Sequence, residues 1–576
     1  RHQDRPIKIL VASFSYVPLQ VVAEKVCEHV DANGNPTRAA QTQKIFLRSQ
    51  SRDPFDLPGV HDLYRKGSAL YLDGKKLARS RDKNLEDGYR RLEDELEESF
   101  IVFGPAQQLF YLGQPSQSKS MFYNFLHTSF AFDLIIVDEA SQMPVDQALT
   151  SLCMVRRGTA SLDLPGQYAG KDHIENREHL EQMSIASMRD YQDNPLSASD
   201  LTRVVIVGDH NQLPPVQPVE VSEKLRPILG SMFEYYVRYQ GVPSQQLSVN
   251  YRSRPEIVGY TRHLGLYQEE IEAYHSGANA YKPLPPVPDN VSDWMRDILD
   301  DERVVSALVH DQQYETAISP LEATLVAQLV EAYYLQMKIE DASQEREFWR
   351  EHIGIVAPHN AQGRLIIRSI SERMSAPGCA KTHLDGAELE ELLRATIYTV
   401  EKFRSSARTF IIALMGISAR DQLSAEETFI YDMNRLNVLT SRAKQKMLMI
   451  CSREFLEYTP RHREVVAAAA RSRDYAMIYC NCKLGVSLKD GEGRHRFVEL
   501  RWHDPSERLA TVPRPLLDSR DVQRASTKPA NEYTPAQEQK LRAALSALGI
   551  DYDALPPQQL ATFAAQVLNM QQRYSD

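Results

Sequence analysis

Short apolar runs alternate with helical patterns along most of this chain, and each run ends in small or polar residues. The strand candidates form two sets, residues 7–13, 100–103, 134–137 and 204–207 in the first and residues 353–357, 396–400, 409–414 and 447–451 in the second. Apolar residues at helical spacing predict helices over 17–30 and 321–337. Strands that alternate with helices are typical of parallel, doubly wound α/β sheets, so the pattern predicts two such domains.

Segments that lack this rhythm set the domain boundaries. The first sheet domain is predicted over residues 1–30 and 100–240, and the second over residues 241–460. Two stretches interrupt the first domain. They are predicted to be a basic, partly helical subdomain over 31–99 and an irregular insertion over 151–200.

The composition changes towards the C-terminus. Prolines among polar residues predict a C-terminal extension and linker over residues 461–533. The run Thr534-Pro-Ala-Gln537 then has the capping pattern of a helix start. A small helical appendage is therefore expected over 534–576, where it can dock a protein partner or cover the chain's own core.

Composition limits the class of protein. Hydrophobic residues make up 42 % and charged residues 25 % of the 576 residues, which are ordinary values for a globular chain of several domains. No stretch approaches the roughly 20 apolar residues that span a bilayer, so no membrane contact is predicted. The net charge of −10 argues against a nucleic-acid coat protein but allows a local basic groove.

One segment is locally basic. Residues 36–91 carry 13 Lys and Arg against 7 Asp and Glu, and Lys75 and Lys76 lie at the centre of the cluster. A patch that contacts a nucleic-acid backbone and a plain solvated surface are both compatible with this pattern.

The six cysteines are scattered, which predicts a reducing, intracellular compartment such as the cytoplasm. Cys480 and Cys482 are separated by one residue and lack a second pair at metal spacing. We interpret them as two small residues near a strand.

Two strand candidates are followed by residues that can bind Mg²⁺, phosphate or water. Asp138 and Glu139 follow the apolar run 134–137, and such a pair can hold Mg²⁺ beside phosphates and activate a water. Gly208 and Asp209 follow the run 204–207, and Gln212 comes three residues later. Glycine permits close backbone approach, and the glutamine amide can bind a water or a phosphate without adding charge. A surface turn after a core strand is the alternative for each pair.

These motifs resemble those of superfamily 1 helicases, in the branch of the RNA-surveillance helicases and the replication helicase–nucleases. Residues 137–142 resemble motif II, and residues 208–215, Gly-Asp-His-Asn-Gln-Leu-Pro-Pro, resemble motif III. The other large branch has Gln-Ser-Ile where this chain has Gln-Leu-Pro. Further likenesses follow in order along the chain: residues 10–16 to motif Ia, 247–253 to motif IV, 354–362 to the strand and loop of the second domain, 399–403 to motif V and 434–443 to motif VI.

The resemblance covers roughly residues 7–452 and implies a fold and a mechanism. It implies two RecA-like parallel-sheet domains with ATP and Mg²⁺ between them and a single strand of DNA or RNA across their tops. It implies that Asp138 binds Mg²⁺, Glu139 is the general base and Gln212 senses the γ-phosphate. Two arginine fingers, Arg252 and Arg442, come from the second domain, where a structural salt bridge is the alternative for each. Other nucleotide contacts are implied for Gly208, Asp209 and Tyr251.

The same resemblance places a second group of residues on the nucleic-acid path. Hydroxyl groups suit phosphate contact, and an aromatic ring can stack on a base. The group consists of Ser15, Tyr16, Pro358, His359, Thr399 and Arg404, to which the basic patch adds Lys75 and Lys76. Tyr16 stands where the family commonly has Asn, so core packing is an equal alternative for it.

The chain departs from the family pattern in two important places. No Gly-x-x-x-x-Gly-Lys-Ser/Thr loop occurs in the 576 residues. The family places this loop just ahead of motif Ia, so we expect it upstream of Arg1, and we expect these residues alone not to hydrolyse ATP. In motif V the usual Phe-Gln-Gly-x-Glu becomes Phe403-Arg-Ser-Ser-Ala407, without the glycine and the acid.

Two functions therefore remain open from the sequence. The first is an ATP-dependent helicase or translocase, whose branch implies 5′-to-3′ travel. The second is a degenerate, helicase-like protein that binds nucleic acid or a partner without ATP turnover. The sequence does not separate DNA from RNA, and it gives neither the pathway nor the oligomeric state.

Overall fold

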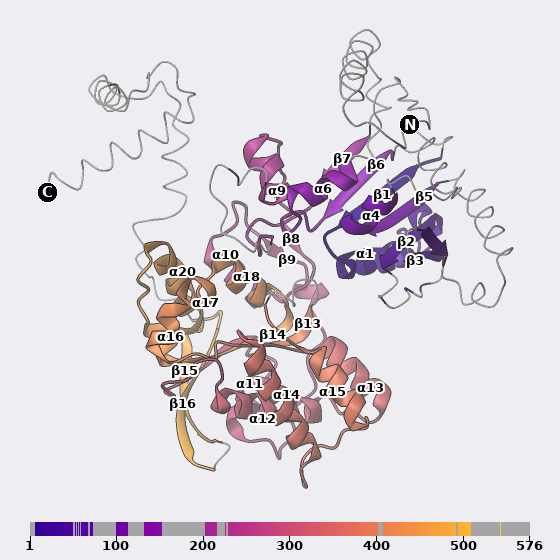
Figure 1. Ribbon diagram of the computed structural model, residues 1–576. Coiled ribbons are helices and arrows are strands. Elements are labelled where there is room, and N and C mark those ends of the chain that lie inside the picture. The colour runs from indigo at the N-terminus through magenta and orange to yellow at the C-terminus, as the bar shows by residue number, and fades with distance from the viewer. Residues whose placement is uncertain are drawn as a thin grey trace. The chain divides into compact units, whose positions relative to one another are not determined.

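The computed structural model describes most of residues 6–507 (Figure 1). The described residues are 6–49, 52, 55, 57, 59–66, 69–72, 99–112, 132–152, 202–215, 225, 229–400, 407–490, 493–507 and 542. The chain forms two compact units, Arg1–Pro505 and Ser506–Asp576. Residues 73–98 of the subdomain predicted over 31–99, nearly all of the appendage predicted over 534–576 and most of the insertion predicted over 151–200 lie outside the described residues.

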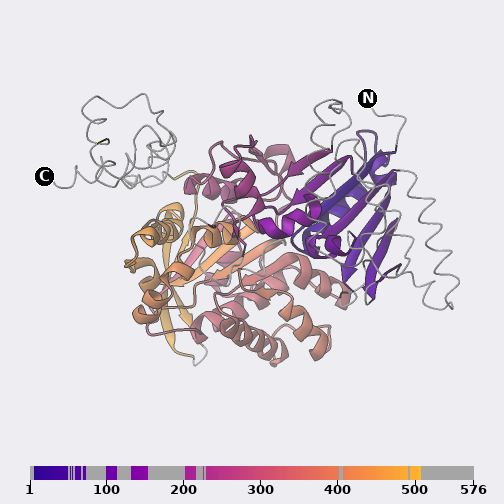
Figure 2. The ribbon, with the colours of Figure 1, turned by 45° about the horizontal axis from the view of Figure 1, so that its top comes forward.

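The first unit contains a seven-stranded sheet near its N-terminus. Its strands are β1 (Lys8–Ser13), β2 (Gln43–Ser49), β3 (Val60–Lys66), β4 (Ala69–Leu72), β5 (Phe100–Pro105), β6 (Leu134–Asp138) and β7 (Arg203–Ile206). They lie in the order β4-β3-β2-β5-β1-β6-β7. Every pairing is parallel except that of β3 with β4, so the predicted parallel α/β class is confirmed. Figure 2 shows the strands side by side in indigo to purple.

The subdomain predicted over 31–99 needs a correction. Its described part does not stand outside the first domain, because β2, β3 and β4 extend the main sheet and β2 pairs with β5. The reason is burial: Ile45, Phe46 and Leu47 are each 1 % exposed and join the core on both sides of the sheet. Burial of apolar surface at about 25 cal/mol per Å² outweighs the polar turns that suggested an insertion.

Among the described residues, four helices accompany the first sheet. They are α1 (Tyr16–Glu28), α2 (Arg38–Gln41), α4 (Ala106–Leu112) and α6 (Val145–Leu152). α1 confirms the helix predicted over 17–30, and its Leu19 and Ala23 are fully buried against the sheet. β1 and β5 bury nearly every residue, as expected for central parallel strands that are covered on both faces.

A second seven-stranded sheet follows in the same unit. Its strands are β10 (Val305–His310), β11 (Ile353–Val356), β12 (Ile397–Tyr398), β13 (Arg408–Leu414), β14 (Ala443–Ser452), β15 (Cys482–Lys489) and β16 (His495–Trp502). Their order is β12-β11-β13-β14-β10-β16-β15. The strands from β12 to β10 are parallel, whereas β16 and β15 are added antiparallel at one edge.

The boundary predicted at residue 460 is therefore wrong. Residues 461–533 were expected to form an extension and linker, yet β15 and β16 complete the second sheet, and Val498 and Leu500 are buried in its core. The physical reason is that β16 pairs with β10 along five residues and brings its apolar side chains against that core. As interpreted from the sequence, Cys482 does lie at a strand.

Helices lie on both faces of the second sheet (Figures 1 and 2). In Figure 1, α11 (Asp293–Leu299), α12 (Pro320–Gln336), α14 (Asn360–Ser375) and α15 (Gly386–Arg394) lie below the strands, with α13 (Ala342–Glu347) beside them. α10 (Pro255–Leu264), α16 (Arg420–Ala425), α17 (Glu427–Ile430), α18 (Met433–Ser441) and α20 (Arg463–Asp474) lie above. α12 confirms the helix predicted over 321–337.

Short elements complete the described structure. They are α9 (Met232–Glu234), α19 (Arg453–Glu457), the paired strands β8 (Val249–Asn250) and β9 (Glu272–Ala273), the π-helical turns Tyr235–Tyr239, Phe348–His352 and Tyr475–Tyr479, and the 3-10 turn Gly277–Asn279. No helix among the described residues is both long and apolar enough to cross a membrane.

The parallel strands decide where polar loops gather. Ser13 pairs with Asp138, and Val137 pairs with Ile206, so the loops after β1, β6 and β7 leave the sheet at one edge. In the second sheet His310 pairs with Ser452, which places the loops after β10 and β14 together. Ligands of open α/β sheets bind at this carboxyl edge.

Candidate functional site

The loop after β6 carries the two acids that the sequence singled out. Glu139 has a φ of +54°, a left-handed conformation that costs a side-chain-bearing residue roughly 1–2 kcal/mol. Its backbone N–H donates to Asp138 Oδ1 at 2.9 Å, and Gln142 Nε2 donates to its Oε2 at 2.9 Å. The strained turn thus holds the two carboxyl groups in a fixed arrangement at the sheet edge.

The loop after β7 packs directly on this turn. Ala140 N–H donates to Val207 O at 2.9 Å, and Asp209 N–H donates to Ser141 Oγ at 3.3 Å. A Cβ on Gly208 would lie 2.8 Å from the backbone nitrogen of Ser141 and 3.0 Å from Phe233 Cδ2. Gly208 therefore permits the close backbone approach that was predicted for it, and the segment that approaches is the turn that carries the acids.

Gly208→Ala is expected to lower the free energy of unfolding by about 1–3 kcal/mol, because backbone atoms must move to admit the new Cβ. A urea melt followed by far-ultraviolet circular dichroism measures this. Gly386→Ala is the matched control: no atom lies within 4 Å of its added Cβ, and it begins helix α15, so it should be neutral or stabilising. Equal stability of the two variants would show that Gly208 does not set the loop spacing.

Asp209 connects the first domain to the second. Its Oδ2 accepts from Gln212 Nε2 at 3.0 Å and from the Tyr267 hydroxyl at 2.7 Å. Asn437 Nδ2 in turn donates to the Tyr267 hydroxyl at 3.0 Å and to the Asn211 carbonyl at 2.9 Å. Residues 211 and 437 are thus in direct contact, although 226 positions separate them.

The sequence missed Tyr267 and Asn437 as site residues. Asn437 lies within the stretch that resembles motif VI, and a fully buried amide in a helix is a usable signal. Tyr267 offered no such signal, because it lies in a short loop after α10 outside every motif. Burial and the neighbouring charge of Asp209 raise the pKa of Tyr267, so its hydroxyl remains a proton donor to Asp209.

The two predicted arginine fingers meet the acids at this seam. Arg442 Nη2 donates to Gln212 Oε1 at 2.7 Å and is 2 % exposed. Arg252 Nη1 donates to the Ser441 carbonyl at 3.1 Å, and the Tyr281 hydroxyl donates to the Arg252 carbonyl at 2.7 Å. The structure therefore brings Glu139, Gln212, Arg252 and Arg442 together from separate parts of the chain.

Burial dominates the electrostatics of this cluster. It raises the pKa of Glu139, an effect that the charges of Arg442 and Arg252 oppose. It also raises the pKa of Asp138. Burial, together with the neighbouring Arg252, lowers the pKa of Arg442 to about 10, and burial lowers the pKa of Arg252 against the attraction of Glu139. Acids and guanidiniums thus share a poorly hydrated space in which opposite charges interact strongly.

Comparisons with known proteins agree with this arrangement. A family model described as an AAA domain matches residues 229–454. The DNA replication ATP-dependent helicase/nuclease JHS1 of Arabidopsis thaliana is 24 % identical over 267 residues, which are 44 % of this chain and 17 % of that protein. The helicase/nuclease DNA2 of Saccharomyces cerevisiae is 24 % identical over 300 residues, 49 % of this chain and 17 % of the relative. These matches make the chain similar to superfamily 1 helicases.

The chain matches only part of these relatives. DNA2 of Xenopus laevis is 26 % identical over 274 residues, 44 % of this chain and 23 % of the relative, so the match spans about a fifth of each relative's length. A solved Pif1 helicase from Bacteroides, in complex with ADP-AlF3 and single-stranded DNA, overlaps 78 % of this chain and 89 % of its own at 11 % identity. Its TM-score of 0.22 is too low to support an inference.

The residues of this candidate site fit a nucleotide and Mg²⁺. Arg442 Nε is buried without a hydrogen-bond partner among the described residues, so a donor is left for an anionic oxygen. Asp138 and Glu139 are partly buried acids whose charged forms a cation would stabilise. Asp138 would hold Mg²⁺, and Arg442 and Arg252 would face phosphate oxygens. Bound Mg²⁺ would supply neutralisation of phosphate charge.

The residues predicted on the nucleic-acid path fall at several places. Ser15 precedes α1 and makes no capping hydrogen bond with its side chain. Tyr16 is half-buried: its hydroxyl accepts from Ser49 N–H at 2.8 Å, and its ring centroid lies 6.5 Å from that of Phe46. These contacts match the core-packing alternative for Tyr16. Thr399 is partly exposed just after β12.

Pro358 and His359 follow β11. The His359 ring stacks on Phe429 with centroids 5.9 Å apart and planes 5° apart, and Arg435 lies over the Phe429 ring at 3.7 Å. His359 Nε2 lies 3.0 Å from Glu426 Oε2. The segment therefore carries a packed stack of side chains at the edge of the second sheet.

Three predicted residues, Lys75, Lys76 and Arg404, lie outside the described residues. Tyr251 is described and is 66 % exposed, with its ring 4.7 Å from that of Tyr274. It lies next to Arg252, but among the described residues no hydrogen bond or ion pair joins its side chain to the acids, so its nucleotide contact remains a prediction.

Proposed function

We propose that this chain is the motor of an ATP-driven helicase that moves along single-stranded DNA in the 5′-to-3′ direction. The relatives are named as DNA replication helicase/nucleases, which favours DNA over RNA. Residues 208–215 resemble motif III of the helicase branch for which 5′-to-3′ travel is implied, and this favours that direction. Asp138, Gly208 and Asp209 hold Mg²⁺–ATP at the carboxyl edge of the first sheet, with Tyr251 contributing from the second half of the chain.

One observation carries the proposal: the hydrogen bond of 2.7 Å between Arg442 and Gln212. It joins motif VI to motif III beside Glu139, so a change at the nucleotide affects both sheet domains. In this arrangement Glu139 accepts a proton from the attacking water at its carboxylate, helped by a raised pKa. Gln212 orients that water, and the two guanidiniums stabilise charge that develops on phosphate oxygens.

A second function is favoured by the sequence itself. The 576 residues lack a Gly-x-x-x-x-Gly-Lys-Ser/Thr loop, and motif V lacks its glycine and acid. Without the backbone amides and the lysine of that loop, phosphate binding loses most of its contacts. The alternative is a helicase-like protein that binds single strands without turnover. We propose that these residues by themselves do not hydrolyse ATP.

Two measurements on the 576-residue chain test the proposal. Fluorescent oligonucleotides of dT and rU report strand affinity as anisotropy over a salt series. We expect dT to bind more tightly and log affinity to fall linearly with log salt, at about −0.7 per phosphate contact. Phosphate release with Mg²⁺–ATP and saturating dT should stay at background.

The outcomes separate the claims. Robust Mg²⁺-dependent turnover by these residues would refute the claim of inactivity. No strand binding at low salt would refute the nucleic-acid assignment altogether. In a form of the protein that carries a phosphate-binding loop, duplexes with a 5′ tail should unwind and those with a 3′ tail should not, and the reverse would overturn the direction.

A further inference from the structure

One exposed aromatic side chain belongs to none of the helicase motifs. Tyr314 lies in the loop between β10 and α12 and is 85 % exposed, more than any other large hydrophobic residue that the structure describes. Its φ is +66°, so the backbone holds this ring outward in a conformation that a tyrosine seldom adopts. Such a position persists only where the surrounding structure fixes it.

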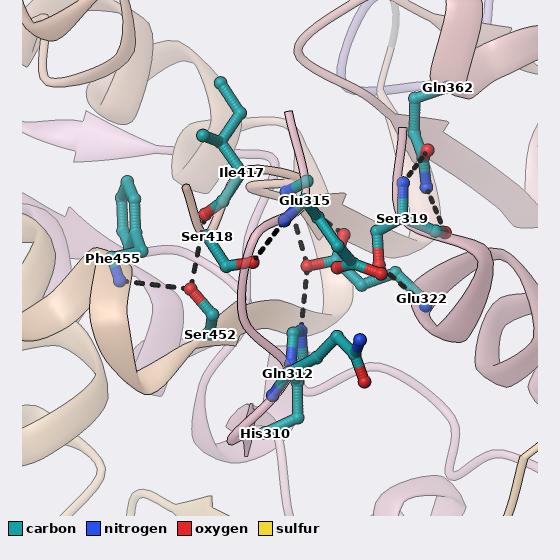
Figure 3. Close-up of polar contacts among 11 residues, drawn as sticks. His310, Gln312, Glu315, Ser319, Glu322, Gln362, Ile417, Ser418, Ser452 and Phe455 are labelled. Atoms are coloured by element: carbon teal, nitrogen blue, oxygen red, sulfur yellow. Dashed lines mark hydrogen bonds and ion pairs between the residues drawn. The ribbon is translucent and has the colours of Figure 1, made fainter. Parts of the chain in front are cut away.

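The surrounding structure does fix this loop (Figure 3). The Glu315 carbonyl accepts from Ser418 N–H at 2.9 Å and from Ala419 N–H at 2.8 Å, and Glu315 N–H donates to Ser418 Oγ at 2.9 Å. On the other side of Tyr314, Gln312 N–H donates to His310 Nδ1 at 3.2 Å. Hydrogen bonds therefore anchor the chain on both sides of the exposed ring.

The anchor continues into the core. Figure 3 shows the Glu322 carboxylate facing His310, whose Nε2 lies 3.1 Å from Oε1. The same carboxylate accepts from Gly416 N–H at 3.1 Å, and all three residues are tied to strand ends of the second sheet. Because Nδ1 of His310 already accepts a hydrogen bond, the ring proton is on Nε2 and is donated to Glu322.

The same network reaches the segment that carries His359. Gln362 Oε1 accepts from Ser319 N–H at 2.7 Å, and Gln362 Nε2 donates to the Ser319 carbonyl at 3.1 Å. A Cβ on Gly416 would lie 3.1 Å from Pro358 Cγ, so these two loops are packed together. Tyr314 is thus held on one rigid edge with Pro358 and His359, where the family resemblance places the strand.

We propose that Tyr314 is a stacking platform for a base of single-stranded nucleic acid. The inference rests on the proposed function and adds a contact outside its motifs. A flat ring that is held rigidly loses little entropy when a base stacks on it. Its exposed neighbours Asp311, Gln313 and Thr316 are polar. Ile318, 43 % exposed, is the other exposed large apolar residue of the loop, so the loop offers little of the continuous apolar area that a protein partner would cover.

The test uses the 576-residue chain and a fluorescent dT oligonucleotide, without nucleotide. Tyr314→Ala should weaken binding about 10-fold, within the range found for loss of one stacked base. Tyr314→Phe should bind like the wild type, because the ring is kept. Phe497→Ala is the matched control: Phe497 is 70 % exposed on β16 and should have no effect.

Abasic scanning identifies the contact as stacking. One abasic position along the oligonucleotide should weaken wild-type binding about 10-fold, and the same oligonucleotide should bind wild type and Tyr314→Ala equally. Glycine adopts a positive φ without strain. The melting temperature of Tyr314→Gly should therefore be no lower than that of Tyr314→Ala, and the two variants should bind the oligonucleotide equally weakly.

The outcomes also separate this inference from the proposed function. If the wild-type chain binds no strand, the proposed function fails first. If it binds and Tyr314→Ala binds equally well, the platform is overturned while the helicase assignment stands. Equal losses in Tyr314→Ala and Phe497→Ala, or no abasic position specific to Tyr314, would also overturn it.

Discussion

Arg442→Ala is expected to lower nucleotide turnover by about a thousand-fold or more in a form of the protein that carries a phosphate-binding loop. An arginine that stabilises charge on the transferring phosphoryl group contributes roughly 10³–10⁵ in rate. Arg442 is placed for this role, because its Nη2 contacts Gln212 at 2.7 Å and its Nε is buried without a described partner. Nucleotide affinity should change by only a few-fold, since the contact matters most in the transition state.

Phosphate release at saturating single strand measures turnover, and a fluorescent nucleotide measures affinity. Arg442→Lys should be nearly as inactive as alanine, because lysine keeps the charge but cannot contact Gln212 and a phosphate at once. Arg368→Ala is the matched control, since Arg368 is 77 % exposed and paired with Glu372 on α14. Wild-type turnover in Arg442→Ala would remove this residue from the mechanism.

Much of this site follows from sequence because of a simple geometric rule. The carboxyl ends of parallel strands meet at one edge, so Asp138 and Gly208 were predictable neighbours once their strands were identified. The partners of Asp209 followed no such rule. Tyr267 reaches Asp209 from 58 positions away through a loop whose path no local pattern encodes, and Asn437, 170 positions beyond Tyr267, donates to the Tyr267 hydroxyl.

The misassigned segment 31–99 shows how charge can hide a strand. Lys44 and Arg48 flank the apolar run of β2, and these charges contributed to the prediction that the segment is a basic, solvent-exposed subdomain. In the structure Lys44 Nζ donates to the Ala40 and Thr42 carbonyls, and Arg48 pairs with the buried Asp62 at 2.5 Å. Both cations are 4 % exposed or less because local partners satisfy them, and a single sequence does not reveal such pairing.

The edge of the second sheet was missed although its sequence carries a strand signal. In β15 apolar residues alternate with polar or small ones from Cys482 to Lys489, yet only Leu488 is fully buried. It is a strand because β16 pairs with it along its whole length, from Cys482 with Trp502 to Lys489 with His495. The strand order around β10 thus depends on a long-range pairing that local periodicity does not carry.

Glu322→Ala is expected to lower the free energy of unfolding of the second sheet domain by about 3–5 kcal/mol. Glu322 is 1 % exposed, and its carboxylate accepts from His310 Nε2 and from Gly416 N–H. Removing the buried carboxylate leaves the His310 Nε2–H and Gly416 N–H donors without an acceptor. The tryptophans report this domain specifically, because the three in the chain, Trp294, Trp349 and Trp502, all belong to it.

Urea unfolding followed by tryptophan fluorescence measures the loss, and two variants test its cause. Glu322→Gln keeps the shape but presents an N–H₂ group to two donors, so it should lose a large part of the stability that alanine loses. Thr324→Ala, two residues along the same helix with its hydroxyl bonded only to Pro320 O at 2.9 Å, should stay within about 0.5 kcal/mol of wild type. If Glu322→Gln proves as stable as wild type, the carboxylate does not anchor the β10–α12 loop, and the rigid support inferred for Tyr314 must come from Glu315 and Ser418 alone.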